Sequence, residues 1–98
     1  MKFLAIEKEI HGKTGEDFKP HLDSEAAQVW EYYKTGLIRE IYFTKEKHEA
    51  VIILECENKN KAEEILNELP LVKAGLITFN IEELVPYDGF ERLFKNRE

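Results

Sequence analysis

Charged side chains interrupt the most strand-like segments of this sequence, and their types are suited to acid–base chemistry. Glu7 follows the apolar start of the first segment, Arg39 and Glu40 interrupt the second, and Glu55 follows the Val-Ile-Ile-Leu run of a third. A charge in the middle of a strand is costly unless it is paired or meets water in a cavity. Several such charges in one small sheet therefore predict a polar pocket on that sheet.

The residue types in this predicted pocket are those that proton transfer requires. Carboxylates that share a partly dry pocket have separated pKa values, so one of them can act as a general base near neutral pH. Removing a proton beside a carbonyl also needs a cation or a hydrogen-bond donor for the developing enolate. Glu55 or Glu7 could be the base, and Arg39 or Tyr42 the donor. The alternative is that these charges form interface ion pairs or lie at wetted sheet edges.

Composition argues against several other classes of function. His11, His21 and His48 lack metal-ligand spacing, and Cys56 is the only cysteine, so we predict no metal, no cofactor and no disulfide. The net charge of −6 disfavours a nucleic-acid partner, and no apolar run is long enough for a membrane helix. The N-terminus reaches Glu7 too soon for a signal peptide, and the lone thiol fits a reducing compartment, so we expect a cytoplasmic protein.

The apolar spacing predicts four strands and two helices that would position these residues. Apolar side chains alternate in the strand segments and recur every three or four positions in the helical ones. The strands are expected at 2–10, 37–44, 49–57 and 76–85, and the helices at 22–35 and 60–69. The order strand-helix-strand-strand-helix-strand is that of the ferredoxin-like fold, an α+β fold in which two helices cover one face of a four-stranded antiparallel sheet.

Local signals mark the ends of the two helices. Asp23 or Ser24 can cap the start of the first, and Gly36 suits the left-handed position just past its end. Asn60 is expected to cap the second helix, and Pro70 to stop it.

The third strand is apolar on both sides, which predicts that both faces of the sheet are covered. Val51 and Ile53 alternate with Ile52 and Leu54. The helices cover one face, and the simplest cover for the other is a second copy, packed sheet to sheet about a two-fold axis. Residues 1–98 are then one domain of a homodimer or higher homo-oligomer, a dimeric α/β barrel.

Strict alternation assigns side chains to the two faces of the sheet. The helix-facing set is predicted to be Leu4, Ile6, Leu37, Ile41, Phe43, Ala50, Ile52, Leu54, Ile77, Phe79 and Ile81. The open face is predicted to carry Phe3, Glu7, Ile38, Glu40, Tyr42, Val51, Ile53, Glu55, Thr78 and Asn80. Glu7, Glu40 and Asn80 would then be ligand-binding residues near Tyr42. Arg39 falls on the helix side by parity, although a bulge or an edge position could turn it.

Two further segments are expected to shape the pocket. Residues 11–21 form a loop that is long for so small a domain. Residues 86–98 form a tail with four large apolar side chains, which a free tail would not expose: Tyr87, Phe90, Leu93 and Phe94. We expect the tail to dock as a short helix, against its own domain or against the mouth of the partner's pocket, either as a structural contact or as a lid.

Three short motifs resemble the muconolactone isomerase family. They are Gly36-Leu37-Ile38-Arg39-Glu40-Ile41-Tyr42, the acid at Glu55, and Leu69-Pro70-Leu71 before the last strand. The similarity covers about residues 30–85. It implies a ferredoxin-like fold, association as dimeric α/β barrels, sometimes in larger rings, and movement of a double bond in an unsaturated lactone by proton transfer, without metal or cofactor.

The resemblance also implies site residues. Arg39, Tyr42 and Glu55 are the positions that correspond to the family's pattern, and we expect them to be catalytic. Glu40 departs from that pattern, since a His or a neutral residue is expected there. The loop at 11–21 and the tail from Pro86 also differ, so the identity of the substrate does not transfer.

The functional expectation is therefore a cofactor-free, isomerase-like enzyme that acts by general acid–base chemistry on a small unsaturated or carbonyl-containing molecule. The alternative is a non-catalytic homo-oligomeric module for ligand binding or assembly. A related oxygenase-type barrel also fits the fold. Single-stranded RNA binding on the sheet would need basic flanks, which the acidic balance does not offer.

Overall fold

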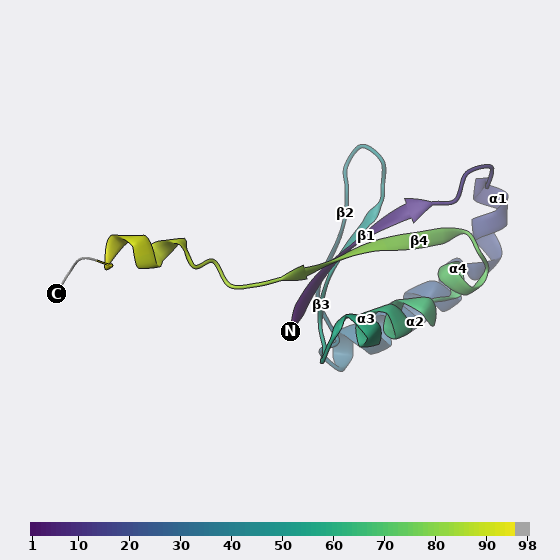
Figure 1. Cartoon of the computed structure of the whole chain (residues 1–98). Helices are drawn as coiled ribbons and strands as arrows, with labels where there is room; N and C mark the ends of the chain where they lie inside the picture. Colours follow the sequence, from purple (N-terminus) through teal and green to yellow (C-terminus); the bar gives the residue numbers. More distant parts are fainter. Residues whose placement is uncertain (96–98) are drawn as a thin grey trace.

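The computed structural model describes residues 1–95 of the chain, and its elements follow the predicted order. Short helical turns are added to the two long helices and the four strands (Figure 1). The elements are β1 (Lys2–Glu9), α1 (Gly15–Phe18), the 3₁₀ turn η1 (Lys19–His21), α2 (Leu22–Lys34), β2 (Ile38–Phe43), β3 (Ala50–Glu55), α3 (Lys59–Asn67), α4 (Pro70–Lys73), β4 (Ile77–Leu84) and the 3₁₀ turn η2 (Gly89–Leu93).

The four strands form one antiparallel sheet in the order β2-β3-β1-β4. Strands β1 and β3, each of which is followed by a helical connection, lie in the centre of the sheet. The long helices α2 and α3 lie on the same face of the sheet (Figure 1). This arrangement confirms the predicted α+β, ferredoxin-like fold.

The core lies mainly between the sheet and α3. Phe3, Ile52 and Leu54 point from the sheet, and Leu66 and Leu69 meet them from α3 and the residues after it, all at most 1% exposed. Burying a side chain of this size contributes about 1.5–3 kcal/mol. In contrast, no residue of α2 is fully buried. The α3 half of the helical layer is therefore the tightly packed half.

The predicted faces of β2, β3 and β4 are largely correct, but the prediction for β1 is wrong. Phe3 and Ala5 are buried under the helices together with Glu7, whereas Leu4 and Ile6 lie half-buried on the open face. Both alternating sets of β1 are mostly apolar, so alternation alone does not decide which set faces the helices.

A β-bulge explains a second error of face. The register between β2 and β3 shifts between Ile38 and Glu40, so Ile38 pairs with Leu54 and Glu40 with Ile53. Ile38 is therefore buried on the helix face, although strict alternation placed it on the open face. Arg39 is the extra residue of the bulge, which is one of the two situations expected to turn its side chain.

The helix ends differ from prediction in three places. Residues 11–21 are not simply a loop, because α1 and η1 lead straight into α2, whose N-cap is His21 rather than Asp23 or Ser24. Asn58, not Asn60, caps α3, since its side chain accepts a hydrogen bond from the Lys61 amide at 2.8 Å. Pro70 begins α4 instead of ending α3. Gly36 has the predicted positive φ, at 85°.

The C-terminal tail forms the predicted short helix as η2, but this segment projects away from the sheet and from α2 and α3 (Figure 1). The rings of Tyr87 and Phe90 pack edge to face with their centroids 4.9 Å apart, and both side chains remain mostly exposed. Docking of the tail against its own domain, one of the two expected arrangements, is therefore wrong for the single chain as far as Lys95. Residues 96–98 of the predicted tail lie outside the described residues.

Among residues 1–95, no helix has the length and the apolar character that crossing a lipid bilayer would require.

Candidate functional site

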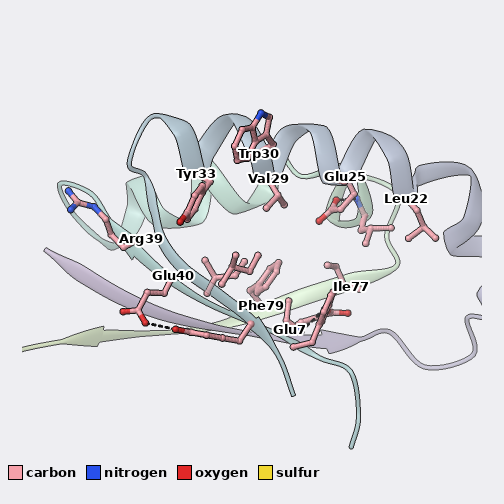
Figure 2. Close-up of a pocket in the computed structure, with 17 residues that line it drawn as sticks. Glu7, Leu22, Glu25, Val29, Trp30, Tyr33, Arg39, Glu40, Ile77 and Phe79 are labelled. Carbon is pink, nitrogen blue, oxygen red and sulfur yellow. Dashed lines mark hydrogen bonds between the residues drawn. The ribbon is translucent and has the colours of Figure 1, made fainter. Parts of the chain in front are cut away.

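A cavity of about 670 Å³ lies between α2 and the sheet (Figure 2). It is on the helix side of the sheet, not on the open face where the sequence placed the pocket. Its roof comes from α2, through Leu22, Glu25, Ala26, Val29, Trp30 and Tyr33. Its floor comes from the strands, mainly through Glu7, Ile41, Ala50, Ile52, Ile77 and Phe79.

The cavity exists because α2 does not close onto the sheet as α3 does. None of the residues of α2 is fully buried, whereas Ala62, Ile65 and Leu66 of α3 are, and the small Ala26 and Ala50 line the space between α2 and the sheet. Leu22, Trp30 and Tyr33 are about half exposed, at 50%, 56% and 49%. These apolar side chains border an open space instead of filling it, as in ligand sites with mostly apolar walls.

Glu7 is the one charged residue of the described chain that is buried, at 6% exposure. It points from β1 into the cavity, and its Oε1 accepts a hydrogen bond from the Ala50 amide at 2.8 Å. Burial raises the pKa of Glu7, the bond from Ala50 opposes this rise, and the charges of Glu9 and Glu49 add to it. The protonated form of this carboxyl is therefore favoured more than in water.

Glu25 is a second acid at the same end of the cavity (Figure 2). It descends from α2, and its Oε1 accepts a hydrogen bond from the Leu71 amide at 2.9 Å. Burial raises the pKa of Glu25, the bond from Leu71 lowers it, and the negative charge of Glu7 raises it again. The two carboxyl groups therefore interact electrostatically, although they belong to different elements.

Sequence reasoning missed Glu25. Its position was nevertheless informative, because it lies three residues after Leu22 and four before Val29, on the apolar stripe of the helix. An acid on that stripe faces the sheet and not the solvent.

Arg39 lies at the opposite end of the cavity, beside the C-terminus of α2 (Figure 2). Its Nε donates a hydrogen bond to the carbonyl oxygen of Gly36 at 2.8 Å. Gly36 makes this contact just after the helix, where its positive φ turns the chain into β2. Within the described residues Arg39 forms no ion pair, so the rest of its guanidinium group remains available.

Glu40 and Tyr42 border the cavity from β2, but their polar ends are bonded to each other. The Tyr42 hydroxyl donates to Glu40 Oε1 at 2.8 Å. This bond to a carboxylate raises the pKa of Tyr42. The Glu40 side chain points below the sheet, away from α2 (Figure 2), which agrees with the predicted open-face position of both residues.

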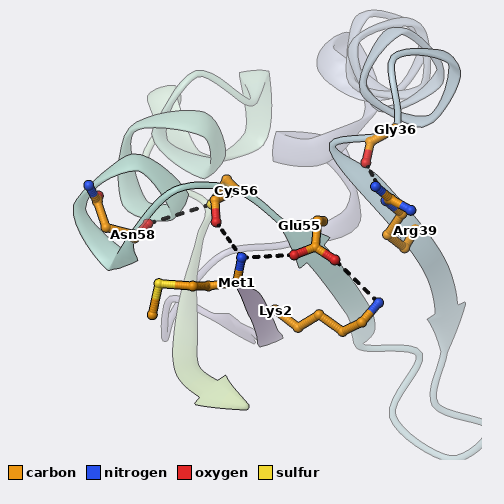
Figure 3. Close-up of polar contacts among 7 residues, drawn as sticks. All are labelled: Met1, Lys2, Gly36, Arg39, Glu55, Cys56 and Asn58. Atoms are coloured by element: carbon orange, nitrogen blue, oxygen red, sulfur yellow. Dashed lines mark hydrogen bonds and ion pairs between the residues drawn. The ribbon is translucent and has the colours of Figure 1, made fainter. Parts of the chain in front are cut away.

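Glu55 and Asn80 lie outside this cavity. The Glu55 carboxylate forms ion pairs with the N-terminal amino group of Met1 at 2.8 Å and with Lys2 Nζ at 3.4 Å (Figure 3). The hydrogen bond from the N-terminal amino group lowers the pKa of Glu55. Asn80 borders a smaller hollow of about 350 Å³ between α3 and β4. The structure therefore brings Glu7 and Arg39 into one cavity and separates Glu55 and Asn80 from them.

The arrangement has the parts of an acid–base site. Two interacting carboxyl groups with raised pKa values lie at one end, apolar walls follow, and a guanidinium group lies at the other. Within residues 1–95, no group of three or more His, Cys, Asp or Glu side chains is placed to hold a metal ion.

Two solved structures have a fold similar to that of this chain. No protein-family model matches the chain, and no curated protein sequence is similar to it. The solved structure of muconolactone isomerase superposes with a TM-score of 0.72 over 90% of this chain and 92% of that one, at 11% sequence identity.

A second similar structure is the 5-chloro-2-hydroxyhydroquinone dehydrochlorinase from Burkholderia phenoliruptrix AC1100, in complex with 2,5-dihydroxybenzoquinone. Its TM-score is 0.64 at 21% identity, and the match covers 91% of this chain and 98% of that one. The resemblance predicted from three short motifs is therefore confirmed in three dimensions: this chain has the fold of muconolactone isomerase.

Proposed function

We propose that the protein is a cofactor-free enzyme of the isomerase type, which transfers a proton on a small unsaturated or carbonyl-containing molecule bound between α2 and the sheet. The observation that carries the proposal is the pair Glu7 and Glu25, two carboxyl groups with raised pKa values at one end of an otherwise apolar cavity. Carboxyl groups whose pKa is raised by an apolar site serve as general acids or bases near neutral pH in enzymes.

In the proposed reaction the two acids have complementary roles. Glu7 in its ionised form removes a proton from the carbon next to a carbonyl group, and Glu25 in its protonated form donates a hydrogen bond to the carbonyl oxygen. Burial and the negative charge of Glu7 both raise the pKa of Glu25, which favours its protonated form and supports this division. Return of the proton from Glu7 to a different carbon completes the shift of the double bond and regenerates both groups.

This assignment keeps one of the two predicted bases and replaces the predicted donor, Arg39 or Tyr42, with Glu25. Glu55 was one of two candidates, but its carboxylate is paired with the N-terminal amino group outside the cavity, so we assign the base to the other candidate, Glu7. We assign Arg39 to substrate binding at the far end. Tyr42 and Glu40 shape the rim of the cavity from β2.

We also propose that the functional unit is a homodimer that hides the open face of the sheet. Leu4, Ile6, Val51 and Ile53 form a half-buried apolar patch there, and charged pairs flank it, such as Lys8 with Glu49 at 3.5 Å. The exposed tail, with Tyr87 and Phe90, would reach the partner's cavity mouth. The lone cysteine, Cys56, is free, which supports a cytoplasmic location for this assembly.

Hydrogen exchange with solvent tests the chemistry without knowledge of the natural substrate. Small unsaturated lactones and enolisable ketones are incubated with the protein in D₂O, and deuterium uptake is followed by ¹H NMR. The Glu7→Gln variant is expected to lose about a hundredfold in exchange rate, because a general base contributes roughly 10²–10⁴-fold. Glu64→Gln, at an exposed surface ion pair, is the matched control and should exchange as the wild type does.

A non-catalytic ligand-binding module is the competing function, and one observation favours it. Each acid already accepts a backbone amide, Ala50 for Glu7 and Leu71 for Glu25, so both carboxylates have a structural reason to be where they are. This reading is correct if the Glu7→Gln and Glu25→Gln variants keep the exchange rate of the wild type, or if the wild type exchanges no compound faster than buffer does.

A further inference from the structure

The guanidinium group of Arg39 is held in position while most of its donors remain unused. Its Nε is bonded to the Gly36 carbonyl oxygen at 2.8 Å, which fixes the group at the end of the cavity. The two terminal nitrogens have no protein partner within the described residues. Such a fork matches the two oxygens of a carboxylate, which it binds through parallel, charge-assisted hydrogen bonds.

The two polar ends of the cavity are separated by a length that α2 sets. Glu25 lies in the first turn of the helix, and Tyr33 lies eight residues on, near Arg39 (Figure 2). At 1.5 Å per residue this is about 12 Å along the helix axis. A ligand that contacts both ends must therefore be roughly 10 Å long.

The walls between the two ends are apolar. Val29 and Tyr33 form the roof there, and Ile41, Ile52 and Phe79 form the floor. A planar unsaturated or aromatic group in the middle of a ligand would bind favourably here, because it displaces water from aliphatic and aromatic side chains. A charge in the middle would have no partner.

We infer that the cavity takes an elongated carboxylic acid, with the carboxylate on Arg39, an unsaturated or aromatic middle, and a hydroxyl or enolisable carbonyl group at the Glu7 and Glu25 end. Arg39 is then an anchor that orients the substrate, and the chemistry takes place at the other end. This inference rests on the cavity of the proposed function, but it concerns recognition and not turnover.

Binding of three matched probes tests the inference by isothermal titration calorimetry. 4-Hydroxycinnamate has a carboxylate and a hydroxyl group about the required distance apart, its methyl ester lacks the negative charge, and cinnamate lacks the hydroxyl group. The wild type is expected to bind 4-hydroxycinnamate about tenfold more tightly than either of the others, which is the size of one charge-assisted hydrogen bond.

Two variants separate the ends of the cavity. Arg39→Ala should bind the acid and the ester equally and still prefer the ligand with the hydroxyl group. Arg39→Lys should regain part of the preference for the acid over the ester. Glu25→Gln should weaken only the preference for the hydroxyl group. Lys61→Ala, which removes a positive charge from the exposed face of α3, should change neither ratio. Circular dichroism confirms that each variant is folded.

The inference is wrong if the wild type binds acid and ester equally, if it binds none of the three probes, or if Arg39→Ala keeps the preference for the acid. These outcomes are independent of the deuterium-exchange test. Intact binding ratios without any exchange would overturn the proposed enzyme and leave the recognition of an elongated acid standing.

Discussion

Glu7 on β1 and Glu25 on α2 lie at the same end of one cavity (Figure 2). Each carboxyl group accepts a hydrogen bond from a backbone amide of another element. Ala50 in β3 donates to Glu7, and Leu71 in α4 donates to Glu25. In each acid, one carboxyl oxygen is therefore occupied by a hydrogen bond that links two elements of the fold. The acids interact because the fold positions them, and not because they are neighbours in the sequence.

Removing the charge of Glu7 should change the titration of Glu25. The negative charge of Glu7 raises the pKa of Glu25, so this pKa is expected to fall in Glu7→Gln. Carbon-13 NMR of the glutamate side-chain carboxyl groups measures the shift. In the control Glu64→Gln the pKa of Glu25 should stay where it is in the wild type, and an unchanged value in Glu7→Gln would mean that the two acids do not interact.

The raised pKa of Glu7 should also appear in the pH dependence of stability. An acid with a higher pKa in the folded state binds its proton more tightly there, so its contribution to stability is complete below the unfolded pKa and is lost as the pH rises through the folded pKa. The free energy of unfolding of the wild type should therefore fall as the pH rises above about 4.5, the ordinary value for Glu7. Urea denaturation should show a smaller fall in Glu7→Gln, and equal slopes would contradict the prediction.

Substituting Glu25 in two ways separates its structural from its chemical part. Glu25→Ala leaves the part-buried Leu71 amide without its acceptor, which is expected to cost about 1–3 kcal/mol of unfolding free energy. Glu25→Gln keeps an oxygen in the same place and should cost less, while it removes the ionisable group. Chemical denaturation gives both values. If the two variants lose equal stability, the bond to Leu71 is not what holds α4 in place.

Any side chain at position 36 is expected to lower the stability of the fold. Its φ of 85° lies in the left-handed region, where a Cβ atom costs about 1–2 kcal/mol, and a Cβ would lie 4.0 Å from Arg39 Nε. Gly36→Ala should lower the unfolding free energy by about that amount. It should also weaken carboxylate binding, because the Gly36 carbonyl orients Arg39. Full stability in thermal denaturation would contradict the first expectation.

A charge on the open face of the sheet should separate the proposed dimer. Ile6 pairs with Val51 in the middle of that face, so Ile6→Lys places an ammonium group where a second sheet would pack. Sedimentation equilibrium is expected to find a folded monomer for this variant and a dimer for the wild type. Ala27→Lys adds the same charge on exposed α2 and should remain dimeric. A monomeric wild type at high concentration would rule out the dimer itself.

The element order and the fold could be predicted from the sequence, because apolar periodicity and turn residues determine both locally. The face of β1 could not, since Phe3, Ala5 and Leu4, Ile6 are about equally apolar and only long-range packing distinguishes them. The bulge that buries Ile38 depends on the register between β2 and β3, which no local pattern records. The sequence also left Glu55 and Glu7 both open as the base, because the two residues look alike until their positions in the sheet are known.

The unequal fit of the two helices separates stability from recognition within one small fold. Substitutions of Leu66 or Leu69 disturb the core, because both side chains are almost completely buried, whereas Ala26 and Tyr33 border the space under α2 and do not belong to that core. The same division makes α2 the place to begin if the binding preference is to be redesigned.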